Sequence, residues 1–303
     1  MIGIQKLIQI TENEKNLLKQ NFIKKLEDPK FVSVIHTLSL DDDILMKYTS
    51  SLEDCAFEFD HCQACSGLSF CKNKIQGYLY APKVQDDSLI FEYVACSYQR
   101  KMMEDTKYKE NITLFETPKS LIEASLKNIY KDDKNRIEVV KQFKYFIDHY
   151  DDLEKPRGIY LYGSFGTGKS YLIAALFNEL AKKGIHSAIV YVPEFLRVLK
   201  SSFDSDYEDK YHYIKTVPVL LLDDIGAENL TAWSRDEILG TILQYRMDEK
   251  LPTFFTSNLD MKQLEEHFSM TASGSDKLKA RRIVERIHYL SKDIKLASEN
   301  RRN

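Results

Sequence analysis

An eight-residue loop, Gly-Ser-Phe-Gly-Thr-Gly-Lys-Ser over residues 163–170, constrains the fold of this chain more than any other feature. The apolar run Gly158-Ile-Tyr-Leu-Tyr precedes the loop, and a segment rich in Ala and Leu follows it. The loop therefore matches the phosphate-binding pattern Gly-x-x-x-x-Gly-Lys-Ser between a strand and a helix. Its glycines let successive backbone N–H groups turn toward phosphate oxygens, and the N-terminus of the helix adds a favourable dipole.

The residues of this loop have distinct expected roles. Lys169 is expected to reach the β- and γ-phosphates of a nucleotide, and the Ser170 hydroxyl is expected to bind Mg²⁺. A glycine-rich turn with a chance lysine is the alternative, and the flanking strand and helix patterns count against it. The predicted nucleotide-binding residues are Gly163, Ser164, Phe165, Gly166, Thr167, Gly168, Lys169, Ser170 and Tyr171.

A pair of carboxylates ends the apolar run Val219-Leu-Leu-Leu-Asp-Asp. Open α/β sheets bind ligands at the carboxyl ends of their strands, so both side chains are expected beside the loop. Asp223 is predicted to hold Mg²⁺ directly or through water, and Asp224 to polarise an attacking water. The chain has no Asn-Lys-x-Asp motif that would read guanine, which favours ATP over GTP.

Helical and strand patterns alternate from residue 136 onward. Strands are expected at 158–162, 187–192, 217–222 and 253–256, and helices over 169–183, 194–201 and 235–249. The strands are continuous apolar runs, which is typical of a parallel sheet covered on both faces, so we predict an α/β fold. Asn258 follows the last of these strands, where it either reaches the γ-phosphate or simply caps the strand end.

Composition excludes several classes of protein. The 303 residues carry 43 Lys and Arg against 46 Asp and Glu, and the net charge of −3 argues against a wholly basic nucleic-acid coat. A hydrophobic content of 43% and an aromatic content of 12% exclude a disordered chain. Apolar runs such as 172–177 are far shorter than the ~18 residues that span a bilayer. Because no signal peptide is visible either, we expect a cytoplasmic protein.

All five cysteines lie between residues 55 and 96. Four of them have the number and spacing of a structural tetrahedral zinc site, which begins with a Cys-x2-Cys pair. The predicted zinc ligands are Cys62, Cys65, Cys71 and Cys96. Cys55 is expected to be a small buried hydrophobic residue, and His61 is an alternative ligand to Cys71. Free thiols, or a redox pair formed by the first two of the four, are the alternative to zinc.

The length of the chain is sufficient for two domains. A small α+β domain with the zinc site is predicted over residues 1–130, with a helix at 11–27 and a strand at 88–95. The charged segment over about 100–130 is predicted to be its linker. The nucleotide-binding domain is predicted over residues 131–303.

The end of the chain, residues 277–303, carries nine Lys and Arg side chains against three acidic ones. Arg282 and Arg286 are four positions apart on a predicted helix, so they share one face. Arginines that have no partner in their own chain can stabilise transferred negative charge at a neighbouring subunit's nucleotide. A solvated basic helix is the alternative, and it is favoured for either arginine taken alone.

Several stretches together resemble the DnaC/DnaI family of bacterial helicase loaders. They are the loop with its preceding strand, Val-Tyr-Val-Pro-Glu-Phe, Pro-Val-Leu-Leu-Leu-Asp-Asp-Ile-Gly-Ala-Glu, Leu-Pro-Thr-Phe-Phe-Thr-Ser-Asn, Arg-Ile-Val-Glu-Arg-Ile and Glu-Asn-Arg-Arg. The resemblance covers nearly the whole chain. It implies an AAA+ ATPase that acts with other primosome proteins to place a ring-shaped replicative helicase on single-stranded DNA. It also implies an N-terminal zinc-binding domain that contacts the helicase.

The same resemblance implies roles for further residues. Asn258 becomes the sensor 1 candidate, and Arg301 becomes the sensor 2 candidate. Arg286 is the preferred arginine finger in trans, with Arg282 beside it, and such contacts need a homo-oligomer. Many AAA+ proteins carry Glu where this chain has Asp224, so the shorter side chain is expected to give weak intrinsic hydrolysis. Two other functions stay open, a transposition-type AAA+ regulator and a zinc-dependent DNA-binding adaptor with a weak nucleotide site.

Overall fold

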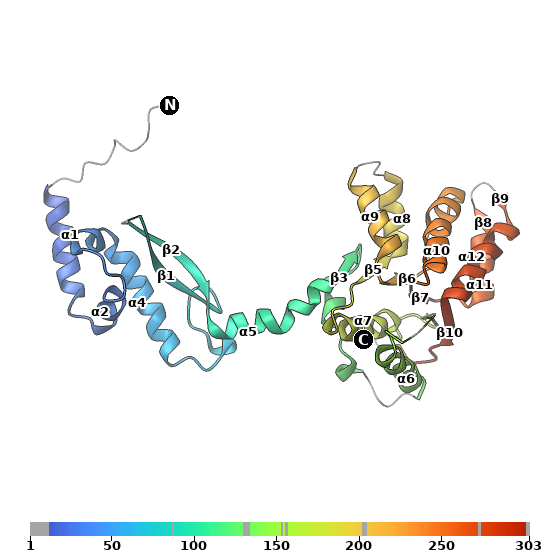
Figure 1. Ribbon diagram of the computed structural model, residues 1–303, viewed down its shortest axis with the longest axis horizontal. Coiled ribbons are helices and arrows are strands. Elements are labelled where there is room, and N and C mark those ends of the chain that lie inside the picture. Colours follow the sequence, from blue (N-terminus) through green and yellow to red (C-terminus); the bar gives the residue numbers. More distant parts are fainter. Residues whose placement is uncertain are drawn as a thin grey trace, which may run out of the picture. The chain divides into compact units, whose positions relative to one another are not determined.

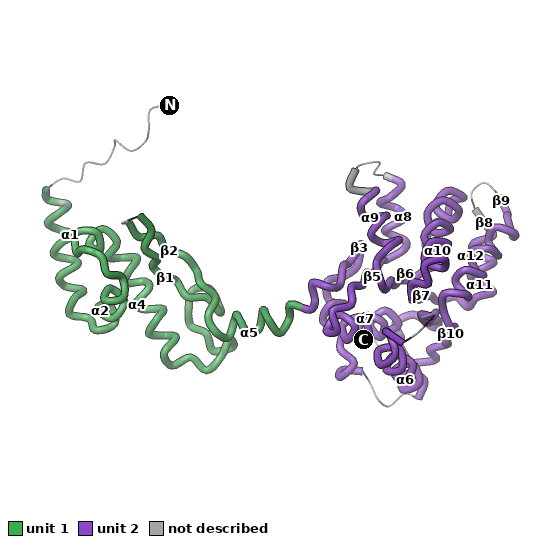
Figure 2. Tube along the Cα trace, in the orientation of Figure 1, with its two compact units in different colours: residues 1–107 green, residues 108–303 purple. Residues whose placement is uncertain are grey.

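The computed structural model describes residues 12–86, 88–129, 134–152, 154, 157–201, 205–271 and 274–300. The chain divides into two compact units, residues 1–107 and 108–303, which Figure 2 shows in separate colours. Within the described ranges, no helix is both long enough and apolar enough to cross a membrane.

Unit 1 combines helices with one antiparallel hairpin, which is the α+β arrangement predicted for the N-terminal part. Its elements are α1 (Glu12–Lys25), α2 (Pro29–Ile35), α3 (Asp42–Leu45), η2 (Met46–Tyr48), α4 (Thr49–Gln63), η3 (Leu68–Phe70), β1 (Tyr78–Gln85), β2 (Ser88–Ala95) and α5 (Ser97–Thr106). The hairpin pairs Tyr78 with Ala95 at its open end and Gln85 with Ser88 at its turn.

A small apolar core holds unit 1 together. Phe22 of α1 meets Phe31 of α2 edge-on, with ring centroids 5.9 Å apart, and both rings are buried. Leu52 of α4 and Leu89 of β2 belong to the same cluster, so one face of the hairpin packs on the helices. Helix α2 begins where Asp28 accepts a hydrogen bond from the Lys30 amide at 2.9 Å, a normal side-chain cap for a helix N-terminus.

Unit 2 is built on a six-stranded sheet whose strand order is β10-β4-β7-β6-β5-β3, with every neighbouring pair parallel. The strands are β3 (Ile112–Phe115), β4 (Gly158–Tyr162), β5 (Ser187–Tyr191), β6 (Val219–Asp223), β7 (Thr253–Ser257) and β10 (Ser291–Lys295). Short strands β8 (Met270–Thr271) and β9 (Gly274–Ser275) form a separate pair. The parallel sheet predicted from the apolar runs is therefore confirmed.

Helices cover both faces of this sheet, as Figure 1 shows. They are α6 (Lys134–Asp148), α7 (Lys169–Lys182), α8 (Val192–Ser201), α9 (Ser205–Thr216), the π-helix η7 (Ser234–Leu239), α10 (Gly240–Asp248), α11 (Met261–Ser269) and α12 (Lys277–Leu290). Helices α6 and α7 pack on one face, and the helices from α8 to α12 pack on the other. Successive strand residues alternate between the two cores, so Leu221 faces α7 while Leu222 faces the opposite layer.

The segment 108–129 differs from the sequence prediction, which placed it in a linker before a boundary near 130. In the structure it belongs to unit 2, because β3 pairs with β5 at the edge of the sheet. Asn111 also donates a hydrogen bond to the Ala181 carbonyl at 3.0 Å, which ties the segment to the end of α7. The strand is only four residues long and follows a charged stretch, so its apolar pattern is too short to stand out.

Candidate nucleotide-binding site

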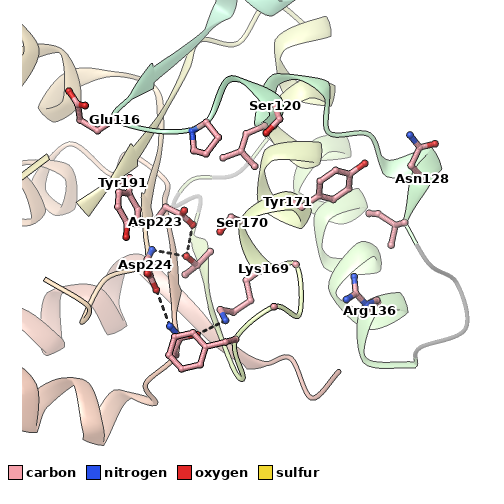
Figure 3. Close-up of a pocket in the computed structure, with 18 residues that line it drawn as sticks. Glu116, Ser120, Asn128, Arg136, Lys169, Ser170, Tyr171, Tyr191, Asp223 and Asp224 are labelled. Carbon is pink, nitrogen blue, oxygen red and sulfur yellow. Dashed lines mark hydrogen bonds between the residues drawn. The ribbon is translucent and has the colours of Figure 1, made fainter. Parts of the chain in front are cut away.

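Three neighbouring strands bring the predicted site residues to one edge of the sheet. The phosphate-binding loop follows β4, Asn258 follows β7, and the two aspartates stand at the end of β6. Because β7 lies between β4 and β6, Asn258 lies between the loop and the aspartates. Figure 3 shows the side chains meeting there, at the carboxyl ends of the strands.

All three glycines of the loop adopt backbone angles that other residues rarely take, and the first and the last of them show why glycine is needed. Gly163 has φ 149° and Gly168 has φ 82°, both in the region that favours glycine. A Cβ on Gly163 would also collide with the carbonyl oxygen of Leu296, which lies just after β10. The loop conformation therefore depends on glycine at these positions, for backbone angle at both and for space at the first.

Lys169 is held by oxygens of the protein itself. Its ammonium Nζ donates to the carbonyls of Gly163 and Ser164, each at 2.9 Å, and to Asn258 Oδ1 at 2.8 Å. The residue is 8% exposed. Asn258 Nδ2 in turn donates to Asp224 Oδ1 at 3.0 Å, so one amide connects the lysine to the acidic pair. The role of Asn258 as a sensor of the γ-phosphate stays a prediction.

Asp223 is fixed by a residue that the sequence analysis missed. Thr256 of β7 donates its hydroxyl to Asp223 Oδ1 at 2.6 Å and accepts the Asp224 amide at 2.8 Å. Asp224 has φ 56°, a left-handed backbone that is uncommon outside glycine and is often found at functional sites. The spacing Thr-Ser-Asn at 256–258 was visible in the sequence, but only the strand order shows what the threonine contacts.

Burial of the Asp223 side chain raises the pKa of its carboxyl above the ordinary value for aspartate. Hydrogen bonds from Ser170 and Thr256 lower the pKa, and the nearby Asp224 charge raises it, but removal from water is the largest cause. Burial therefore makes the charged form of Asp223 unfavourable in the absence of a cation. A carboxylate beside a serine hydroxyl offers hard oxygen ligands of the kind that Mg²⁺ prefers. Ser170 and Asp223 therefore fit the predicted magnesium ligands.

Replacing Asp223 by asparagine is expected to stabilise the metal-free protein at neutral pH. A raised folded-state pKa means that the folded state holds the proton more tightly, so wild-type stability falls as pH rises from the unfolded pKa to the folded one. The variant lacks this penalty. Denaturant titrations across pH should therefore show the largest gain at neutral pH, and a gain that shrinks toward pH 4.

Asp236 provides a control of opposite sign, because its hydrogen bond with Arg235 lowers its pKa. Asp236→Asn should lose stability at neutral pH. If Asp223→Asn lost as much stability as Asp236→Asn, the buried Asp223 carboxylate would stabilise the fold instead of destabilising it.

The site opens into a cavity of about 770 Å³, large enough for a nucleotide. One wall comes from the segment 116–129, which the sequence analysis assigned to the linker. Tyr171 joins this wall to α7, because its hydroxyl accepts the Ser125 amide at 3.2 Å. The lining residues that the sequence analysis missed are Glu116, Pro118, Ser120, Leu121, Asn128, Ile129, Arg136, Tyr191 and Thr256. These residues belong to no recognisable motif, and most of them lie far from the phosphate-binding loop in the sequence.

The predicted arginines do not lie with the lysine in this structure. Arg286 donates to the Gly240 carbonyl at 3.0 Å, at the start of α10, and Arg282 is exposed on α12. Neither lines the cavity. Arg301, the sensor 2 candidate, lies outside the described residues.

A second cavity, of about 70 Å³ in unit 1, is lined by all four predicted zinc ligands: Cys62, Cys65, Cys71 and Cys96. Backbone or amide N–H groups donate to three of the sulfurs, from Gly77 and Gln99 at 3.4 and 3.5 Å and from Asn73 at 3.4 Å. Still, no three His, Cys, Asp or Glu side chains in the described part of the chain are arranged to hold a metal ion as they stand.

The other two residues of the cysteine prediction, Cys55 and His61, are not among the residues that line that cavity. Cys55 belongs to the core of unit 1, where burial raises the pKa of its thiol to about 12. This agrees with the buried hydrophobic role predicted for it. His61, the alternative ligand, packs edge-on against Phe57 with ring centroids 4.3 Å apart, while Cys71 lines the cavity. The choice between a ligand set of four cysteines and one that includes His61 stays a prediction.

The fold and the site together define a P-loop nucleotide-binding protein. Comparison with known proteins narrows this class. Residues 133–303 match the family model described as IstB-like ATP binding protein. The replicative helicase loader DnaI of Bacillus subtilis (strain 168) is 39% identical over 266 residues, which span 87% of this chain and 86% of that protein. The chain therefore belongs to the IstB-like ATP binding proteins and to the family of replicative helicase loaders that includes DnaI.

Two further comparisons agree with this assignment. A crystal structure of DnaI is 48% identical, with a TM-score of 0.59, and the match covers 65% of this chain and 100% of that one. The replicative helicase loader DnaC of Escherichia coli (strain K12) is 29% identical over 105 residues, or 34% of this chain and 42% of that protein. The resemblance stated from the sequence motifs is thus confirmed.

Proposed function

We propose that this protein loads a replicative DNA helicase onto single-stranded DNA and that ATP at the described site controls the step. The observation that carries the proposal is the continuous line of contacts from Lys169 through Asn258 to Asp224, in a chain that matches a helicase loader over 87% of its length. The match extends into unit 1, so the transposition-type regulator and the DNA-binding adaptor are not favoured. We place the protein with the replication machinery in the cytoplasm.

The nucleotide chemistry follows from the contacts. Lys169 exchanges its protein oxygens for those of the β- and γ-phosphates, and Asp224 orients the attacking water. Asn258 lies between Lys169 and Asp224, so it is in a position to distinguish ATP, which has a γ-phosphate, from ADP, which has none. Mg²⁺, held by Ser170 and Asp223, neutralises phosphate charge when it is bound. Asp224 is shorter than glutamate by one methylene, which supports weak intrinsic hydrolysis and a role for ATP as a switch.

A neighbouring copy of the chain is proposed to supply an arginine in trans, which stabilises negative charge on the transferred phosphate. Arg282 is exposed on α12 and is therefore accessible to another subunit, whereas Arg286 is bonded to the Gly240 carbonyl and must leave it to act in trans. Exposure supports Arg282 as the first candidate. Basic side chains on the same helix are also available to a DNA backbone.

Unit 1 is proposed to contact the helicase and to carry structural Zn²⁺. Support for zinc comes from four thiols that line one small cavity and from N–H groups that donate to three of the sulfurs. N–H donors around sulfur stabilise thiolate ligands in metal sites. Four cysteines suit the closed tetrahedral coordination of a structural site, and bound zinc would supply folding free energy to a unit with a small core.

The test is reconstitution with the full-length chain, the hexameric helicase of the same organism and circular single-stranded DNA. We expect the chain to form a complex with the helicase and to increase the amount of helicase on DNA when ATP is present. Helicase retained on DNA is measured by gel filtration and by strand displacement. Absence of any helicase complex, with the protein folded and ATP bound, would overturn the loader proposal.

A further inference from the structure

A buried arginine outside the phosphate-binding loop contacts that loop directly. Arg136 lies in the first turn of α6 and is 3% exposed. Its Nη2 donates to the carbonyl of Thr167, within the loop. A Cβ on Gly168 would lie 3.6 Å from Nη1 and 3.7 Å from Nη2, so the guanidinium packs against the same peptide. Arg136 also lines the nucleotide cavity (Figure 3).

The contact determines which way one loop peptide faces. The chain has no cis peptide bond in its described part, so the Thr167 carbonyl and the Gly168 N–H point in opposite directions. Holding the carbonyl against α6 turns the Gly168 N–H away from the arginine. Gly168 has φ 82°, a conformation open to glycine, and an unrestrained peptide at such a position can rotate.

The helix that carries Arg136 is itself well anchored. Val139 and Phe143, from the following turns of α6, are fully buried in the core shared with α7. Asn135 donates to the Ala297 carbonyl at 2.8 Å, which ties the first turn to the segment after β10. The backbone of Arg136 is therefore anchored through contacts of α6 that lie outside the loop.

We propose that Arg136 is a positioning residue for the phosphate-binding loop. It fixes the Thr167–Gly168 peptide so that the Gly168 N–H faces the bound phosphates, and its charge adds positive potential to the cavity wall. The inference rests on the proposed binding of ATP and adds a residue that lies 31 positions before Thr167 in the sequence. Charged donors make the stronger hydrogen bonds, and low-dielectric surroundings strengthen them further.

The test compares Arg136→Gln with Arg136→Lys in the full-length protein. We expect the glutamine variant to bind ATP and ADP about 10- to 100-fold more weakly, since a lost charge-assisted contact has that effect on an equilibrium. The lysine variant keeps a charged donor and should recover most of the affinity. In steady-state assays, KM for ATP should rise more than kcat falls. Millimolar methylguanidinium should restore binding to Arg136→Ala, and equimolar urea should not.

Arg246 provides a matched control within the same chain. It is also fully buried and also donates to backbone carbonyls, at 2.7 Å to Val217 and at 2.9 Å to Pro252, but it does not line the cavity. Arg246→Gln should lower the melting temperature and leave the ATP dissociation constant of the folded protein unchanged. This pair separates the loss of a buried arginine from the loss of a loop contact.

The outcomes are decisive in each direction. If wild-type protein binds ATP and folded Arg136→Gln binds it equally well, the positioning role is wrong. Equal losses in the glutamine and lysine variants, without rescue by methylguanidinium, would show a packing role and overturn it too. If neither Arg136→Gln nor Arg136→Met folds, the residue is structural and the proposal fails. Failure of the wild-type chain to bind ATP would instead overturn the proposed function.

Discussion

Replacing Lys169 by alanine should abolish tight ATP binding and leave both units folded. The Lys169 ammonium donates hydrogen bonds to three protein oxygens. In the nucleotide complex, its N–H groups would donate to phosphate oxygens instead. Losing this contact should weaken ATP binding by about 100-fold or more, because charge-assisted hydrogen bonds are worth roughly 3 kcal/mol. Calorimetry with ATP and with ADP measures the effect, and a loading assay should show that ATP no longer matters.

The same variant should still bind the helicase, because the proposed contact lies in unit 1. Lys182→Ala is a suitable control, since that lysine is at the far end of α7 and pairs with Glu179 at 2.7 Å. An exposed pair of this kind contributes little, so both affinity and loading should stay near wild type. ATP-dependent loading that survives in Lys169→Ala would rule out the nucleotide switch.

Replacing Cys71 by serine should remove bound zinc and destabilise unit 1. Its sulfur lines the small cavity and accepts the Gly77 amide at 3.4 Å. Protein purified without chelator is expected to hold about one zinc per chain, and the variant close to none, because a structural site needs all four ligands. Metal analysis by mass spectrometry gives the stoichiometry. Since zinc binding contributes to folding, proteolysis should cut the variant preferentially within residues 12–106.

Cys55→Ala is the matched control, because Cys55 is buried in the core and does not line the cavity. That variant should keep its zinc and lose only the packing of a small side chain. Equal zinc content in the wild type, Cys71→Ser and Cys55→Ala would mean that the metal is adventitious. Zinc-free wild-type protein with full activity would leave the four cysteines as free thiols.

Most of the candidate site could be predicted from the sequence because its residues lie in short local motifs. The loop at 163–170 and the aspartates at 223 and 224 are each contiguous, so their pattern is complete within a few residues. The parallel sheet followed from strands with no polar face. Strand β10 escaped notice because Ser-Lys-Asp-Ile-Lys is largely polar and lies at the edge of the sheet, where only one side of the strand needs a partner.

The rest of the site depends on the order of strands and on contacts between distant segments. Thr256 acts on Asp223 because β7 pairs with β6, a fact that no spacing in the chain encodes. Arg136 reaches the loop from a helix that precedes β4, and its charge is unremarkable within a segment of mixed lysines and acids. Residues such as these become visible only when tertiary structure shows which side chain lies beside which peptide.

The three hydrogen bonds of Lys169 also bear on how readily the site empties. In many binding pockets a ligand meets a cation that only water has surrounded. Here the ammonium already has a complete set of oxygen neighbours from the loop and from Asn258. When a phosphate binds, its oxygens replace the protein oxygens around the ammonium. The net gain in binding free energy is therefore the difference between the two sets of hydrogen bonds. When the nucleotide leaves, the protein oxygens can return to the ammonium, so release does not expose an unpaired buried charge.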